Sequence, residues 1–422
     1  MLIEFSVTNF ISIRETQVLS MVSGKLSDEL QNRDFKIPNS ESLANLNLLT
    51  SSVIYGANAA GKSNLLKAID AMHDIVLFSA GSRQRGESLE VIPFKLDSAY
   101  KNAPSEFEVL IAIDGIKYQY GFSATQQRII DEWLIAYPKK RPQLWFSREW
   151  SNNDNEYEWN FGSNLLGQKQ TWKDSTRDNA LFLSTAVQLN SEQLKPIFDW
   201  FSKTLHFIGV GGISDGYSAH KCTEGYREKI LNFLKNAGIG IDDINVEKDK
   251  FNPDKMLSPE TPDEIKKLLI EEMKDETLYR VSTTHLNNEG KPETFKLSEE
   301  STGTRKLFAF SAPWIEVLEN GNILVVDELH DNLHPKLVKY LVNLFHNPKI
   351  NKNNAQLIFT THETSILNQK IFRRDQVWFC EKGENNNTEV YPLVKFKPRK
   401  GREDLEATYL AGGYGAIPYT KD

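Results

Sequence analysis

Alternating apolar and polar residues mark a series of strands in the first half of the chain. Residues 107–113 and 116–122 alternate on either side of Asp114-Gly115, a dipeptide typical of a tight hairpin turn. Residues 129–137 and 143–148 show the same alternation, which indicates strands with one buried face. The pattern therefore predicts an antiparallel sheet in this part of the chain.

Shorter segments are apolar almost throughout. Residues 51–55, 323–326 and 356–360 form such runs, which are typical of parallel strands covered on both faces. Residues 64–78 and 307–317 have the spacing of helices. We therefore predict an α/β fold with a mixed central sheet and a separate antiparallel β lobe.

The middle of the chain has a helical character. Residues 193–206, 225–236 and 262–274 have helical patterns, and residues 278–285 and 293–297 predict two further strands. No heptad pattern is sustained, so we expect a helical lobe and no long coiled coil.

Composition narrows the possible classes of protein. The 422 residues carry a net charge of −7, which argues against a surface coated with positive charge for nucleic acid. The two cysteines, Cys222 and Cys380, are far apart in sequence and predict no disulfide framework. No apolar run has membrane-spanning length, and the first residues lack the pattern of a secretory signal. We expect a cytoplasmic protein with no membrane association.

Residues 56–63 read Gly-Ala-Asn-Ala-Ala-Gly-Lys-Ser, the pattern of a P-loop, between a predicted strand and a predicted helix. Backbone N–H groups of such a loop point at phosphate oxygens. Lys62 can reach the β- and γ-phosphates, and the Ser63 hydroxyl can bind Mg²⁺. The alternative is a glycine-containing turn with an incidental Lys-Ser. The nucleotide-binding residues predicted here are Gly56, Asn58, Ala59, Ala60, Gly61, Lys62, Ser63 and Asn64.

Two later strands end in residues suited to the same chemistry. The run 323–326 is followed by Asp327 and Glu328, at the edge where α/β sheets bind ligands. Asp327 can hold Mg²⁺, and Glu328 can polarise an attacking water. His362 follows the strand at 356–360, where it can face the γ-phosphate. The alternatives are a charged turn and an ordinary histidine at a strand end.

A second candidate anion site lies before the Asp-Glu strand. Ser301-Thr302-Gly303-Thr304 is a turn of small residues at the start of a helix, and helix N-termini bind anions. One nucleotide needs only one P-loop, so this turn makes sense if it serves the nucleotide of a neighbouring subunit. The alternative is a helix with a simple N-cap.

The order of these motifs resembles that of ABC-type ATPases, in their RecF/SMC-like branch. More narrowly, the chain resembles the compact AAA-family ATPases of bacterial anti-phage and abortive-infection systems; it is RloA-like and similar to the ATPase subunit of PARIS. The resembling segments span nearly the whole chain. They are residues 3–5, Asn9-Phe10, 56–63, Pro93-Phe94, 177–179, 301–304, 327–335, Thr361-His362 and 412–418.

The resemblance implies ATP and Mg²⁺ as cofactors and ATP hydrolysis by an ABC-type P-loop head. Glu328 would be the general base and His362 would contact the γ-phosphate, beside Lys62. Ser301 and Gly303 would act in trans across a head-to-tail ATP-sandwich homodimer, alone or within a higher oligomer.

A glutamine that contacts both Mg²⁺ and nucleotide is also expected from the resemblance. We assign it to Gln188, because the strand-like run at 180–187 leads into the helix-rich region. The alternative is a surface glutamine. Three features depart from the family pattern. The signature turn at 301–304 reads Ser-Thr-Gly-Thr and not the Ser-Gly-Gly-Gln of transporters. Ile11 stands where many relatives carry a basic residue, with Arg14 as a substitute, and His330 stands where relatives are often acidic.

The resemblance also suggests a division into three segments. Residues 1–190 would form the N-terminal ATPase lobe with the P-loop and the antiparallel β subdomain, and residues 191–297 a mostly helical lobe. Residues 298–422 would form the C-terminal ATPase lobe, with the D-loop at 331–334 and a basic tail at 395–402.

Two functions are compatible with these features. In one, ATP-dependent dimerisation is a switch that holds and releases an effector protein, such as a TOPRIM or HNH nuclease, in response to a phage-encoded trigger. In the other, the protein is a DNA-maintenance ATPase that clamps DNA itself. The acidic net charge and the missing coiled-coil arms favour the first.

Overall fold

The computed structural model describes residues 1–26, 30, 32–38, 40, 43–139, 141–250, 262, 277–399 and 401–418. The backbone divides into two compact units. The first unit comprises Met1–Val210, Val317–Asp331 and Val338–Asp422, and the second comprises Gly211–Glu316 and Asn332–Leu337. The first unit is therefore assembled from three separate stretches of sequence.

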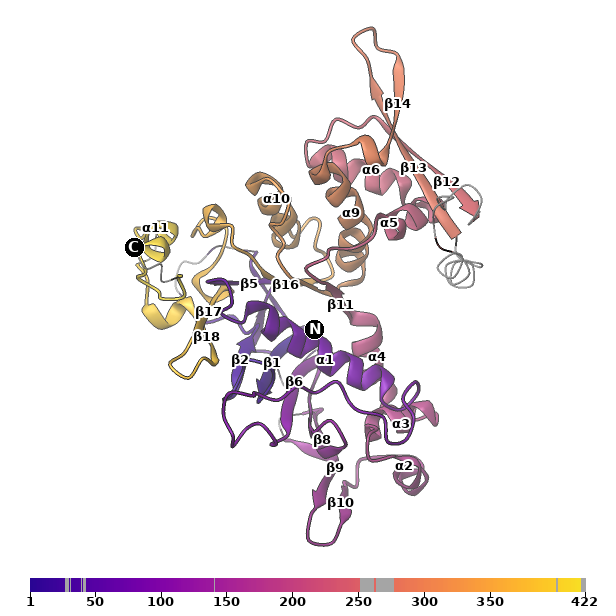
Figure 1. The fold of residues 1–422 in the computed structure, drawn as a ribbon, viewed down its shortest axis with the longest axis vertical. Helices are drawn as coiled ribbons and strands as arrows, with labels where there is room; N and C mark the ends of the chain where they lie inside the picture. The colour runs from indigo at the N-terminus through magenta and orange to yellow at the C-terminus, as the bar shows by residue number, and fades with distance from the viewer. Residues whose placement is uncertain are drawn as a thin grey trace. The chain divides into compact units, whose positions relative to one another are not determined.

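A six-stranded sheet in the first unit has the order β11-β15-β16-β5-β17-β18 (Figure 1). Its strands are β5 (Ser51–Gly56), β11 (Leu205–Ile208), β15 (Ile323–Val326), β16 (Gln356–Thr360), β17 (Val377–Lys382) and β18 (Thr388–Pro392). All neighbouring strands are parallel except β17 and β18. Every residue of β5, β15 and β16 is buried, which explains why these segments are mostly apolar and do not alternate.

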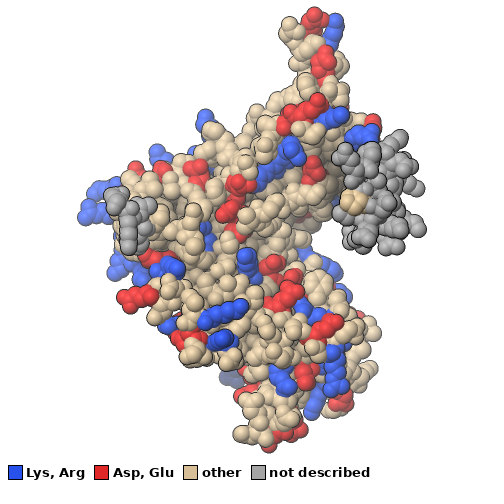
Figure 2. All heavy atoms as spheres, viewed as in Figure 1, with Lys and Arg blue, Asp and Glu red and all other residues tan. Residues whose placement is uncertain are grey.

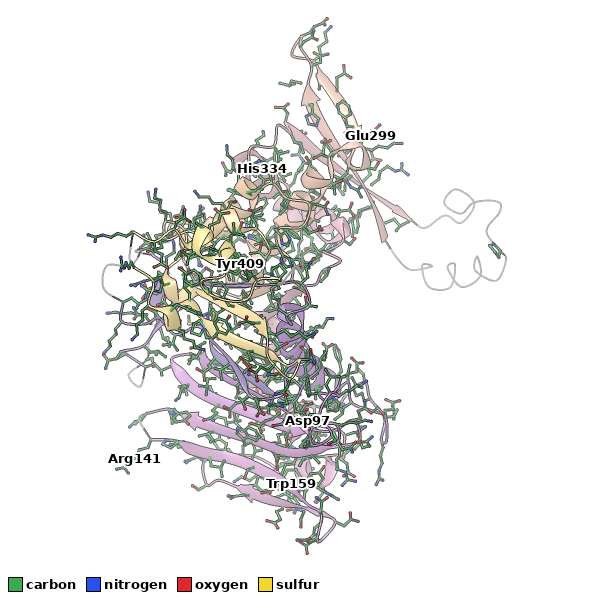
Figure 3. The ribbon with its side chains drawn as sticks, turned by 60° about the vertical axis from the view of Figure 1, so that its left-hand side comes forward. Asp97, Arg141, Trp159, Glu299, His334 and Tyr409 are labelled. Atoms are coloured by element: carbon green, nitrogen blue, oxygen red, sulfur yellow. The ribbon has the colours of Figure 1, made fainter. Side chains whose placement is uncertain are left out.

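A seven-stranded antiparallel sheet also belongs to the first unit, in the order β10-β9-β8-β7-β6-β1-β2. Its strands are β1 (Leu2–Thr8), β2 (Gln17–Ser20), β6 (Ser105–Ile113), β7 (Ile116–Ala124), β8 (Ile129–Tyr137), β9 (Gln143–Ser151) and β10 (Glu156–Phe161). The predicted hairpin is confirmed, since Ile113 pairs with Ile116 around Asp114-Gly115. The strand β10, which carries Trp159, extends the predicted sheet at one edge (Figure 3).

One hydrophobic core joins the two sheets through the helix α1 (Lys62–Phe78). Leu65 and Met72 of α1 share this core with Val325 of the central sheet and with Phe107 of the antiparallel sheet. The helix that begins at the P-loop is therefore held by apolar contacts from both sheets, which fixes the direction in which its N-terminus points.

Smaller elements complete the first unit. They are β3 (Asp34–Lys36), β4 (Asn47–Leu49), α2 (Lys169–Ser175), α3 (Phe182–Gln188), α4 (Lys195–Asp199), the π-helix η1 (Trp200–Thr204), most of α10 (Pro335–His346), the 3₁₀ turns η4 (Thr364–Ile366), η5 (Arg374–Gln376) and η6 (Leu393–Phe396), and α11 (Leu405–Leu410).

The C-terminal segment packs on the central sheet. Tyr409 of α11 stacks on Phe379 of β17, with 5.4 Å between ring centroids, and also contacts Tyr55 of β5 at 5.8 Å (Figure 3). Tyr414, in the glycine-rich segment that follows, is buried and also lies against Phe379. This aromatic cluster places the tail beside the strand that leads into the P-loop.

The second unit contains α5 (Asp215–Lys221), the π-helix η2 (Cys222–Tyr226), α6 (Arg227–Asn236), the 3₁₀ turn η3 (Leu297–Glu299) and most of α9 (Thr302–Asn320). Three antiparallel strands form its sheet: β12 (Asp243–Lys250), β13 (Thr277–Leu286) and β14 (Pro292–Lys296). The predicted helix at 225–236 and the strands at 278–285 and 293–297 are confirmed. The predicted helix at 262–274 lies outside the described residues.

Two predictions of local structure were wrong. Residues 180–187 are not a strand: α3 covers Phe182–Gln188. The buried carboxylate of Glu132 accepts the N–H groups of Phe182 and Leu183 at 2.7 and 3.0 Å and so satisfies the start of a helix. The helix predicted at 193–206 ends earlier, because Leu205–Ile208 pairs in parallel with β15 as the strand β11. The first stretch of the first unit includes β11 and ends at Val210, beyond the boundary at residue 190 that was expected from the sequence.

The predicted α/β fold, with a largely parallel sheet and an antiparallel lobe, is confirmed by the strand pairing. The longest helix in the described parts of the chain, α9, has 19 residues. None of the described helices combines the length and the apolar character needed to cross a membrane.

Candidate nucleotide-binding site

The P-loop connects β5 to α1, and two glycines in it are required by close neighbours. A Cβ atom on Gly56 would lie 2.3 Å from the carbonyl oxygen of Cys380 in β17. Gly61 has a φ of 101° and caps α1, and a Cβ there would lie 1.9 Å from Oγ1 of Thr388. Larger residues would displace the loop, because neither neighbour can move without its strand.

Lys62 is the first residue of α1, and its side chain folds over the loop. Nζ donates to the carbonyl oxygens of Gly56 at 2.9 Å and Ala57 at 3.0 Å. Burial lowers the pKa of Lys62, and the nearby Cys380, Glu328 and Asp327 oppose that shift. The ammonium group is thus held at the mouth of the loop, where it can bind phosphate.

Ser63 and Asp327 line one cavity of about 300 Å³. The other walls come from α1, from β15, and from β11 with the residues after it. They are Leu66, Lys67 and Asp70, then Val325, then Phe207, Ile208, Gly209 and Val210. A hydroxyl and a carboxylate oxygen are ligands that Mg²⁺ prefers. The residues present therefore fit a Mg²⁺ site at the carboxyl edge of β15.

Glu328 follows Asp327 in an unusual backbone conformation. Its φ is 53°, in the left-handed region that residues other than glycine rarely adopt. Its N–H donates to Oγ1 of Thr360 at 2.8 Å, and the same hydroxyl donates to Oδ1 of Asp327 at 2.5 Å. The carboxylate of Asp327 and the backbone of Glu328 are thus tied to the end of the neighbouring strand β16.

His362 lies just beyond that strand, beside a second histidine. Its backbone N–H donates to Nδ1 of His330 at 3.4 Å, and the two rings pack edge to face with centroids 5.5 Å apart. Burial, with smaller contributions from Lys62 and His330, lowers the pKa of His362 to about 4. His362 is therefore neutral near pH 7 and can donate one ring N–H.

The family model described as "AAA domain, putative AbiEii toxin, Type IV TA system" matches residues 51–368, which include the P-loop, Asp327, Glu328 and His362. The chain belongs to this family.

Two further comparisons add little. No curated protein matches the sequence. Among solved structures, cbiO1 from Clostridium perfringens, described as part of the ABC transporter complex cbiONQ, is 10% identical over 92% of this chain and 94% of that chain, with a TM-score of 0.30. A likeness at this level supports no argument about function.

Membership of the family accounts for a P-loop ATPase domain in this chain, and most of the predicted site residues meet in it. Asn58 and Ala59 are exposed on the loop, Ala60 is buried, and Asn64 of α1 donates from Nδ2 to Oγ of Ser12 at 2.7 Å. The site therefore unites the P-loop with the ends of β15 and β16, which are separate in sequence but adjacent in the sheet.

Gln188 is not brought to this site. It is the last residue of α3 and is not among the residues that line the cavity beside Ser63 and Asp327. The strand next to β15 on that side is β11, and Gly209 and Val210 follow it. The assignment of Gln188 rested on a strand at 180–187 that is a helix in the structure.

Arg14 is also engaged elsewhere. Its guanidinium lies 3.5 Å from Asp97 and 3.2 Å from Glu15, over the ring of Tyr100. The N-terminal turn instead supports the P-loop through Ser12, whose Oγ lies 2.7 Å from Oγ1 of Thr388.

Ser301 and Gly303 belong to the second unit. Oγ of Ser301 accepts the backbone N–H of Thr304 at 3.1 Å, so Ser301 is the N-cap of α9. A Cβ on Gly303 would lie 3.4 Å from the carbonyl oxygen of Asn332. Within the chain these residues therefore form a capped helix N-terminus, and their action on a second subunit stays a prediction.

Four residues of the site were not predicted from sequence: Thr360, His330 as a partner of His362, Thr388 and Ser12. Thr360 is two residues before His362. Its position at the end of a predicted buried strand could have indicated that it lies near the site. Nothing in the sequence near Thr388 indicates a contact with the P-loop.

Proposed function

We propose that this protein binds and hydrolyses ATP with Mg²⁺ and acts as a switch that controls a partner effector. The observation that carries the proposal is that Ser63 and Asp327 share one cavity. Glu328 directly follows Asp327 in sequence, and Lys62 directly precedes Ser63 at the start of α1.

Each residue has a defined task in hydrolysis. The backbone of the P-loop and the ammonium group of Lys62 bind the phosphates. Ser63 and Asp327 would hold Mg²⁺, which neutralises charge on the phosphate oxygens. Glu328 accepts the proton of the attacking water, and the neutral ring of His362 donates an N–H to the γ-phosphate.

We infer that the active form is a head-to-tail homodimer in which the N-terminus of α9 of one subunit completes the site of the other. Ser301 and Thr302 are exposed at the start of this 19-residue helix, and such a terminus favours a negative charge. The resemblance to ABC-type ATPases supports the same arrangement.

The description of the family supports a role in abortive infection or toxin–antitoxin defence, and the resemblance to RloA and to the PARIS ATPase narrows it to anti-phage defence. A nuclease encoded beside this protein is the effector we expect. The acidic net charge and the mixture of Lys and Arg with Asp and Glu on the face drawn in Figure 2 favour a protein partner over direct DNA clamping.

The test is Glu328→Gln. This change preserves shape and the Asp327 carboxylate but removes the base, so ATP should still bind while hydrolysis falls by at least about a hundredfold. Light scattering should then show an ATP-dependent dimer that persists. Wild-type turnover in this variant, or no association with ATP, would contradict the proposed mechanism.

The effector is tested separately, by co-purification of the neighbouring gene products with wild-type protein and with Lys62→Ala, which should not bind nucleotide. An effector that binds both forms equally in the presence and absence of ATP would contradict a nucleotide-controlled switch.

A further inference from the structure

Thr360 is a buried residue that contacts three consecutive residues of the predicted catalytic loop. Its relative exposure is 0%. Its hydroxyl donates to Oδ1 of Asp327 and accepts the N–H of Glu328, and its carbonyl oxygen accepts the N–H of Leu329 at 3.1 Å. The two hydrogen bonds of this hydroxyl account for the burial of a polar group.

The sheet register puts Thr360 in this position. β15 and β16 run in parallel, and Val326 pairs with Phe359. Thr360 is therefore level with Asp327, one residue beyond the last pair. A side chain from one strand end can then reach the loop that leaves the next.

The hydrogen bond to Glu328 matters because of its backbone. At a φ of 53° this residue is in a conformation that a glutamate adopts only when its surroundings hold it there. The bond from its N–H to Thr360 is a contact that fixes this conformation, and with it the direction in which the carboxylate leaves the loop.

A further contact links the same two loops. His330, two residues after Glu328, accepts the N–H of His362, two residues after Thr360. The loop that carries the base and the loop that carries the histidine expected at the γ-phosphate are therefore connected by hydrogen bonds within the protein.

We propose that Thr360 is a positioning residue for ATP hydrolysis: its hydroxyl orients the base Glu328 and the Mg²⁺-binding carboxylate of Asp327 at the same time. This inference rests on the proposed ATPase function. Its action is through the carboxylate of Asp327 and the backbone of Glu328, the two groups that its hydroxyl contacts.

Thr360→Val tests the hydroxyl alone, because valine has nearly the same shape. The loss of two hydrogen bonds should lower kcat by about tenfold or more. The Kd for ATP, measured with a fluorescent analogue, should change by less than about threefold, because the P-loop and Lys62 supply most of the binding. Thr360→Ser keeps the hydroxyl and should restore most of kcat.

A second measurement separates positioning from general loosening. In a Glu328→Gln background, Thr360→Val should lower the residual rate less than it does in wild-type protein, because the group that it orients is already inactive. If the valine variant does not fold, Thr360→Ala replaces it, since alanine introduces no new contact.

Three results would overturn the inference while the ATPase function stands. They are a wild-type kcat in Thr360→Val, an equal decrease of kcat in Thr360→Ser, or a decrease of the rate by the same factor with Glu328 and with Gln at position 328. A wild-type protein that does not hydrolyse ATP would instead overturn the proposed function, and this inference with it.

Discussion

Thr388→Val should loosen the P-loop without replacing any residue that is itself predicted to bind nucleotide. Thr388 begins β18 and is 1% exposed. Its hydroxyl donates to the carbonyl oxygen of Ala60 at 3.0 Å and lies 2.7 Å from Oγ of Ser12. Valine preserves the shape beside Gly61 but removes both contacts. The backbone bond from Thr388 to Ser12, at 2.7 Å, remains.

The size of the effect follows from these two contacts. Each lost hydrogen bond is worth about 1 kcal/mol. We therefore expect a loss of about 2 kcal/mol in total. If all of it falls on the binding conformation of the loop, the Kd for ATP rises by up to about 30-fold.

The assay is equilibrium titration with a fluorescent ATP analogue, together with thermal unfolding. Thr388→Ser is the matched control, because it retains the hydroxyl and should bind ATP within about threefold of wild type. Wild-type affinity and stability in Thr388→Val would refute this reasoning. Equal damage in the serine variant would show that the methyl group, and not the hydroxyl, supports the loop.

Three further predictions concern other parts of the chain. Ser301→Arg should keep nucleotide binding but lower ATPase activity by about tenfold or more; an equal mixture with Lys62→Ala should recover about a quarter of wild-type activity, since half of the dimers then hold one intact site. Failure to recover despite proven subunit exchange would exclude action in trans. Replacing Arg399 and Arg402 by alanine should leave basal ATPase activity unchanged and weaken partner binding; if DNA is the partner, the salt dependence should become shallower by about one per lost phosphate contact. The pKa of His362 is lowered from an ordinary 6.5 to about 4. Between these two pH values His362 takes up a proton in the unfolded chain but not in the folded chain. The free energy of unfolding should therefore fall as pH falls from 6.5 towards 4. His362→Asn should lose less stability there in thermal melts, and an equal loss would contradict the assignment.

The parts of the site that are local in sequence could be predicted without a structure. The P-loop is a strand, a loop and a helix in consecutive residues, so its glycines, Lys62 and Ser63 could be assigned without a structure. The run before Asp327 could be assigned to a buried parallel strand for the same reason. Because parallel strands end at one edge of a sheet, the meeting of Ser63 with Asp327 also follows from the pattern.

The prediction of secondary structure was wrong where a residue distant in sequence determines the local structure. Residues 180–187 are apolar enough for a strand, but Glu132, 50 residues from Phe182 in sequence, caps them as a helix. The assignment of Gln188 failed with that strand. The predicted helix at 193–206 included the first residues of β11, because a four-residue strand is too short to show the alternation of apolar and polar residues that marks a strand.

The side chains that hold the site residues in place could be identified only after the chain was seen folded. Thr360 contacts Glu328 across 32 residues, and Thr388 contacts Ala60 across 328. Such contacts are single hydrogen bonds between a side chain and the backbone, and they leave no periodic pattern in sequence. They exist because sheet pairing places strand ends from distant segments side by side. The sequence therefore determines the chemistry of this site, and the packing of the sheet determines which residues orient it.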